Sequence, residues 1–144
     1  MKNNTKANVL LVVPARLNSS RLPNKVLADI GGKPMLQRVL EQCKKAIDTS
    51  KIVLCTDSEK LSSLAKNLSI NSILTSESCD SGTDRIASVI DKLINISLNS
   101  FNNYAYENID DLKKGTLIIN VQGDQPFLDP KVIKEMCSFF YGAS

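Results

Sequence analysis

A short basic loop contains the first residues of this sequence that could carry out chemistry. Arg16, Arg21 and Lys25 lie close together after an apolar run, and Ser20 lies among them. Clustered cations repel one another, whereas a triphosphate needs cations, hydroxyls and backbone N–H groups that converge on it. The loop therefore predicts a triphosphate site, with a solvated basic loop as the alternative. Its sequence matches neither the Walker A nor the GxGxxG pattern, so those phosphate cradles are excluded.

A second candidate is the Gly123-Asp124 turn, which follows the strongly apolar run at residues 116–121. Glycine lets the chain turn sharply, and the carboxylate of Asp124 is then presented at the end of a strand. Mg²⁺ takes few protein ligands and relies on the oxygens of its substrate, so a single carboxylate suits it. The turn thus predicts a magnesium ligand, and the alternative is a solvated aspartate at a strand end.

The third candidate is the segment from Asp80 to Arg85, at the start of a predicted helix. Ser81 or Thr83 can cap that helix, and a helix N-terminus is also a site for anions and polar ligands. A cation in the first turn opposes the helix dipole, so we expect Arg85 to have a partner. Asp80, Asp84 and a bound ligand are the alternatives.

Strand and helix patterns alternate around these loops. Buried strands are predicted at residues 9–13 and 51–55, and further strands at residues 70–74 and 116–121. Helices are predicted from Pro34, from Ser58, over residues 83–94 and from Pro130. Continuous apolar strands alternating with helices predict an α/β fold with a mostly parallel sheet covered on both faces. Such sheets bind ligands outside the carboxyl ends of their strands, where the three candidate loops lie.

Composition limits the classes of function. A chain of 144 residues suits one domain. A net charge of only +3, with no clustering of Lys and Arg with aromatic residues, argues against a nucleic-acid partner. The longest apolar run is too short to span a membrane, and the polar start is not a signal peptide. The Asn- and Ser-rich stretch at residues 95–114 has no clear period. It is either an irregular connection or an unrecognised short helix.

The cysteine and histidine content indicates reduced thiols and no zinc site of the usual kind. The four cysteines lie far apart without a CxxC pair, and the sequence has no histidine. These features exclude the usual zinc arrangements and any histidine-based acid–base scheme. We therefore expect reduced, mostly buried thiols in a cytoplasmic protein, and Lewis-acid chemistry only from an oxygen-ligated ion such as Mg²⁺.

Several blocks of the sequence together resemble one family. They are Pro14-Ala15-Arg16, Ser20-Arg21-Leu22-Pro23 with Lys25, Leu27-Ala28-Asp29-Ile30, Gly32-Lys33-Pro34-Met35, Cys55-Thr56-Asp57, Ser81-Gly82-Thr83-Asp84-Arg85-Ile86-Ala87 and Val121-Gln122-Gly123-Asp124. In order and spacing the chain resembles the 3-deoxy-manno-octulosonate (Kdo) cytidylyltransferase family, also called CMP-Kdo synthetases. The blocks span nearly the whole chain.

The resemblance implies a doubly wound, nucleotide-diphospho-sugar transferase-like α/β fold. It also implies the transfer of CMP from CTP to Kdo, with release of pyrophosphate, for lipopolysaccharide synthesis. It implies a triphosphate site at Arg16, Ser20, Arg21 and Lys25, with Gln122 placing the nucleotide or the sugar. The substrate side would include Ser81, Gly82, Thr83 and Arg85. Asp124 would bind Mg²⁺, and Lys25 and Asp124 would be the catalytic residues.

The sequence also departs from the family. Gln125 replaces the usual Glu, Cys79-Asp80 replaces a His-Gln-like pair, and Asn24 and Val26 flank Lys25 in place of Gly and Pro. Family members are longer, and their C-terminal part supplies a second metal carboxylate, much of the sugar pocket and the homodimer surface. We therefore expect residues 1–144 to be the nucleotide-binding part of a cytidylyltransferase domain, which is either truncated or completed by another polypeptide.

Three alternative functions compete with this interpretation. A non-catalytic nucleotide-binding remnant would keep only the first half of the site. A related cytidylyltransferase would act on another acidic sugar, such as an acylneuraminate, although the Val121–Asp124 block argues against that enzyme. A receiver-like regulator needs acidic residues after the first strand, where this chain has Pro14-Ala15-Arg16.

Overall fold

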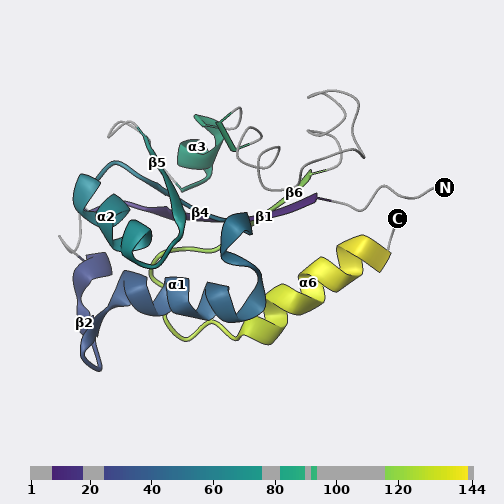
Figure 1. Cartoon of the computed structure of the whole chain (residues 1–144), viewed down its shortest axis with the longest axis horizontal. Helices are drawn as coiled ribbons and strands as arrows, with labels where there is room; N and C mark the ends of the chain where they lie inside the picture. Colours follow the sequence, from purple (N-terminus) through teal and green to yellow (C-terminus); the bar gives the residue numbers. More distant parts are fainter. Residues whose placement is uncertain (1–7, 18–24, 76–81, 90–91, 94–115, 143–144) are drawn as a thin grey trace.

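A parallel sheet forms the centre of the molecule. The computed structural model describes residues 8–17, 25–75, 82–89, 92–93 and 116–142. Its main sheet has the strand order β5-β4-β1-β6, and every pairing in it is parallel (Figure 1). The strands are β1 (Asn8–Ala15), β4 (Ile52–Thr56), β5 (Asn71–Leu74) and β6 (Thr116–Asn120). These bounds confirm the four predicted strands and the parallel sheet.

Both faces of the two central strands are buried. Along β1 the side chains alternate between two apolar clusters, because successive residues of a strand point to opposite faces. Val9, Leu11 and Val13 belong to one cluster, whereas Leu10 and Val12 belong to the other. All five residues of β4 are buried as well. This two-sided burial explains why the sequence shows continuous apolar runs instead of alternation.

Helices cover both faces of the sheet (Figure 1). On one face lie α1 (Met35–Ala46), α2 (Glu59–Asn67) and α6 (Pro130–Gly142), and on the other lies α3 (Gly82–Ala87). The Oγ of Ser58 accepts a hydrogen bond from the backbone N–H of Leu61 at 3.3 Å, which confirms the predicted cap of α2. Pro130 begins α6 as predicted, and the Asp129 carboxylate accepts a bond from the Lys131 N–H at 2.9 Å.

The helix predicted over residues 83–94 is wrong as one continuous element. Helix α3 ends at Ala87, and Ser88 and Val89 form a turn. The Ser88 hydroxyl donates to the Arg85 carbonyl at 2.7 Å, and the Val89 N–H reaches back only three residues, to Ile86. Serine side chains compete in this way with regular helical bonding. Ile86, Val89 and Leu93 are nevertheless buried as predicted, whereas Ile90 and Ile94 lie outside the described residues.

A small hairpin before α1 was not predicted. Its strands are β2 (Asp29–Ile30) and β3 (Lys33–Pro34), joined by Gly31 and Gly32 at φ values of +61° and +93°. Only glycine adopts such angles without strain. Pro34 therefore lies at the N-cap of α1, one residue before the helix that it was predicted to begin. A 3₁₀ helix, η1 (Lys25–Leu27), precedes the hairpin, and another, η2 (Thr49–Lys51), precedes β4.

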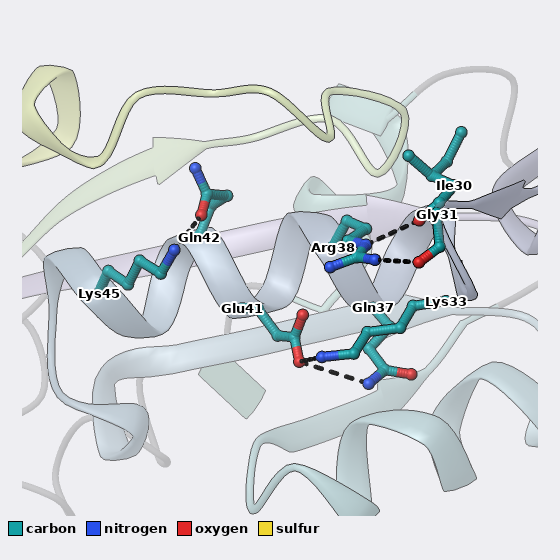
Figure 2. Close-up of polar contacts among 8 residues, drawn as sticks. All are labelled: Ile30, Gly31, Lys33, Gln37, Arg38, Glu41, Gln42 and Lys45. Carbon is teal, nitrogen blue, oxygen red and sulfur yellow. Dashed lines mark hydrogen bonds and ion pairs between the residues drawn. The ribbon is translucent and has the colours of Figure 1, made fainter.

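Side chains of α1 hold this hairpin in place (Figure 2). The Arg38 guanidinium donates to the carbonyls of Ile30 and Gly31 at 2.8 and 2.6 Å. Lys33 pairs with Glu41 at 2.9 Å, and this hydrogen bond lowers the pKa of the Glu41 carboxyl below its ordinary value. Backbone bonds link Ala28 to Lys25 and Met35 to Ala28. The segment that begins at Lys25 is thereby fixed against α1.

The cysteines agree with the prediction of reduced, buried thiols as far as they are described. Cys43 and Cys55 are free and buried, and burial raises the pKa of each thiol to about 12. Cys137 is free and half-buried, and Cys79 lies outside the described residues. Within the described ranges, no helix is both long and apolar enough to cross a membrane.

Candidate functional site

The predicted site residues follow the carboxyl ends of the strands, as the fold requires. Arg16 comes directly after β1 and is exposed, and Lys25 begins η1. Gln122 and Asp124 follow β6, which is the neighbour of β1 in the sheet. The remaining predicted residues cannot be placed with them: Ser20, Arg21 and Ser81 lie outside the described residues, and Gly82 and Thr83 are described only as backbone at the start of α3.

An ion pair joins two of the predicted loops. The Nζ of Lys25 lies 2.9 Å from Oδ2 of Asp124, although the two residues are 99 positions apart. Each side chain is 41% exposed, so the pair lies at the surface and is open to solvent. The sequence predicted each residue as functional, one for phosphate and one for a metal, but it gave no sign that they contact one another.

Gly123 lets the loop after β6 approach β1 closely. Its residue is buried, and a Cβ added there would lie 3.0 Å from the Ala15 Cβ and 3.4 Å from both the Leu36 Cδ1 and the Pro14 carbonyl oxygen. The sequence predicted that glycine is needed for a sharp turn. Gly123 is indeed in a turn, but its φ is not positive, so the requirement for glycine comes from space.

The turn that carries Asp124 is also held by glutamine side chains. The backbone N–H of Gln122 donates to Oε1 of Gln125 at 3.3 Å, and the Gln122 side chain donates to the Asn120 amide oxygen at 3.1 Å. Gln125, which replaces the glutamate usual in the family that the sequence resembles, thus folds back onto its own turn. Its amide oxygen fills an acceptor position there without adding a charge beside Asp124.

Arg85 forms a separate buried network beside the site. Its residue is only 2% exposed, and its guanidinium donates a short hydrogen bond to the Thr75 hydroxyl and lies 3.7 Å from the Asp57 carboxylate. Thr75 and Asp57 follow β5 and β4, so Arg85 ties α3 to the ends of two strands. Asp57 was not among the partners that the sequence suggested for Arg85. The substrate-binding role of Arg85 remains a prediction.

The donor chemistry at Asp124 fits a hard cation. Within the described ranges, no group of three or more His, Cys, Asp or Glu side chains could hold a metal ion. A single exposed carboxylate suits Mg²⁺, because this ion keeps several waters and takes further oxygens from substrate phosphates. Asp124 is therefore the residue that would hold Mg²⁺ here, and the ion would depend on nucleotide and water for its other ligands.

Replacing Gly123 by alanine should destabilise the protein and displace the Asp124 turn. The added methyl group meets the Ala15 methyl group at 3.0 Å, so the two segments must separate by a few tenths of an ångström. We expect a loss of about 1–3 kcal/mol in the free energy of unfolding, which is typical of overpacking. Urea denaturation measures this loss. Ala15→Gly in the same chain should recover part of it, and strictly additive losses would show that the two methyl groups do not clash.

Comparison with known proteins gives consistent matches. Residues 10–139 match the family described as Cytidylyltransferase. The 3-deoxy-manno-octulosonate cytidylyltransferase of Francisella tularensis is 43% identical over 129 residues, which are 90% of this chain and 44% of that protein. The enzyme of the same name from Polynucleobacter necessarius is 41% identical over 137 residues, which are 94% of this chain and 47% of that protein. The chain thus spans less than half the length of these relatives.

Solved structures share the fold. A CMP:2-keto-3-deoxy-manno-octonic acid synthetase complexed with CTP matches with a TM-score of 0.72 and 29% identity, over 94% of this chain and 48% of that one. A cytidylyltransferase from Leptospira borgpetersenii matches with a TM-score of 0.61 and 23% identity. The match covers 92% of this chain and 48% of the Leptospira chain. The second match supports the fold alone, and it agrees with the doubly wound sheet described above.

Proposed function

This chain belongs to the cytidylyltransferase family, and we propose that it forms the nucleotide-binding part of an enzyme that transfers CMP from CTP to Kdo. The observation that carries the proposal is the contact between Lys25 and Asp124 at the carboxyl edge of β1 and β6. A cation for phosphate oxygens and a carboxylate for a divalent ion are thereby in one place. The relatives named as Kdo cytidylyltransferases support the choice of nucleotide and sugar.

In this reaction the anomeric hydroxyl of the sugar attacks the α-phosphorus of CTP. The new P–O bond forms as the bond to the bridging oxygen breaks, and pyrophosphate leaves. Such transfers depend mainly on positioning and on neutralising negative charge. Lys25 and the exposed Arg16 supply positive charge for the triphosphate, together with Ser20 and Arg21 of the same loop. Gln122 helps to place the nucleotide, and the segment from Ser81 to Arg85 contributes to the side that faces cytosine and sugar.

Mg²⁺ is the proposed cofactor, and Asp124 is the residue of this chain that holds it. When bound, the ion neutralises phosphate oxygens of the triphosphate. We further propose a cytoplasmic enzyme of lipopolysaccharide synthesis that acts as a homodimer in its full-length form. A reduced compartment suits the free, buried Cys43 and Cys55.

Binding of nucleotides tests the proposal directly. The chain should bind Mg-CTP in preference to Mg-ATP, Mg-GTP and Mg-UTP, as measured by isothermal titration calorimetry. Lys25→Met should weaken CTP binding by about 1.5–3 kcal/mol, the range for hydrogen bonds to charged groups. Lys33→Met is a matched control, because Lys33 also forms a 2.9 Å surface ion pair, with Glu41, but is not one of the proposed triphosphate ligands.

Equal affinity for ATP and CTP would contradict the cytidylyltransferase assignment. An unchanged CTP affinity in Lys25→Met would contradict the role of Lys25 in binding the triphosphate. Preferential CTP binding, without transfer activity even after the chain is joined to the C-terminal portion of a longer relative, would favour the alternative of a non-catalytic nucleotide-binding remnant. CTP selectivity combined with turnover on another acidic sugar would favour a related cytidylyltransferase.

A further inference from the structure

The contact between Lys25 and Asp124 places two proposed ligand groups in competition. The Lys25 ammonium contacts Oδ2 of Asp124 at 2.9 Å, so it occupies one oxygen of the carboxylate that would hold Mg²⁺. The same ammonium is the group proposed to bind triphosphate oxygens. An ammonium hydrogen-bonded to a carboxylate lowers the negative charge that a cation meets there. Without nucleotide, each group therefore weakens the other as a ligand.

The surroundings allow the lysine to change partner without a change of fold. Both side chains are 41% exposed, and a lysine has a flexible stem with three rotatable donors. The backbone is held in place on both sides of the ion pair. On the Lys25 side, η1 is hydrogen-bonded to the segment that leads into α1, and on the Asp124 side, Gly123 packs against Ala15. Movement of the Lys25 side chain alone is thus enough to free the carboxylate.

We propose that the Lys25–Asp124 ion pair makes metal binding depend on nucleotide binding. The inference rests on the proposed function, because it takes Lys25 as a triphosphate ligand and Asp124 as a metal ligand. In the nucleotide-free protein, Lys25 holds Asp124 and disfavours a divalent cation. A triphosphate, which carries more charge than one carboxylate, draws the Lys25 ammonium away, and Asp124 then becomes available to the ion.

The size of the effect follows from the exposure of the pair. Exposed ion pairs contribute little, so removing Lys25 should raise the affinity of the nucleotide-free chain for a divalent cation by about two- to fivefold. Linkage makes the coupling between the two ligands reciprocal. The factor by which a triphosphate at Lys25 raises the affinity of Asp124 for the cation equals the factor by which the cation raises the affinity for the triphosphate.

The test uses Mn²⁺ alone as the probe, with NMR spectra of the full 144-residue chain. Paramagnetic broadening of the backbone amide signal at position 124 reports metal binding even when it is weak. Lys25→Met should lower the Mn²⁺ concentration for half-broadening by about two- to fivefold, whereas the matched variant Lys33→Met should leave it unchanged. Asp124→Asn should abolish the site-specific broadening in every background.

A second measurement follows the partner exchange itself. Metal-free CTP, in the presence of a chelator, should move the Asp124 carboxyl carbon signal of the wild-type chain toward its position in Lys25→Met. The proposal is overturned if Lys25→Met leaves Mn²⁺ binding unchanged or weaker, or if saturating CTP leaves the carboxyl signal in place. Broadening that survives Asp124→Asn is a different outcome, because it would contradict the proposed metal role of Asp124.

Discussion

Arg85→Met should lower the free energy of unfolding by about 3 kcal/mol, the low end of the range for breaking a buried ion pair. Methionine keeps much of the buried volume but removes the contacts to the Asp57 carboxylate and the Thr75 hydroxyl. Both partly buried partners then lose the guanidinium. Asp57 is still 14% exposed, so water compensates part of the loss. Urea denaturation monitored by circular dichroism measures the change.

Lys33→Met is the matched control for this prediction. It breaks an ion pair whose lysine is 42% exposed, so its cost should stay within about 1 kcal/mol. Because the pairing lowers the pKa of Glu41, the stability that it adds is present above pH 4.5 and is lost as the pH falls below that value. Equal losses in the two variants would show that burial does not strengthen the Arg85 network.

The sheet and its covering helices could be predicted because their signals are local. The β1 and β4 runs are apolar on both faces, and this pattern alone indicates strands of a covered parallel sheet. The Ser58 cap and Pro130 similarly mark helix starts from the residue type. The β2–β3 hairpin could not be predicted, because strands of two residues show no periodicity.

The pairings within the site were not predictable for another reason. Lys25 meets Asp124 because β1 and β6 are neighbours, and Arg85 meets Asp57 because α3 packs against β1 and β4. Strand order brings these residues together across long stretches of sequence, and periodicity does not reveal strand order. Residue type therefore identified Lys25, Arg85 and Asp124 as candidates, but only the fold shows which side chains each of them contacts.

A polypeptide of these 144 residues should release pyrophosphate from CTP and Kdo at a rate close to background. Catalysis by positioning falls steeply when reacting groups are loosely held, and misplacement by about 1 Å costs roughly 100-fold. Asp124 is the one proposed metal ligand in the chain, and no larger cluster of metal-binding side chains occurs in the ranges that the structure describes. The relatives named as Kdo cytidylyltransferases are more than twice as long as the portions that match this chain, which are 44% and 47% of their lengths.

Joining the chain to the unmatched C-terminal portion of a longer relative, or adding that portion in trans, should restore turnover. Phe127, Val132 and Met136 are exposed apolar side chains on and before α6. In the restored enzyme, Asp124→Asn should lower the rate by about 100-fold or more, since the ion would lose its carboxylate. Lys33→Met serves as the neutral control. Vigorous pyrophosphate release by the 144-residue chain alone, dependent on both CTP and Kdo and abolished by Asp124→Asn, would show that these residues already form a complete active site.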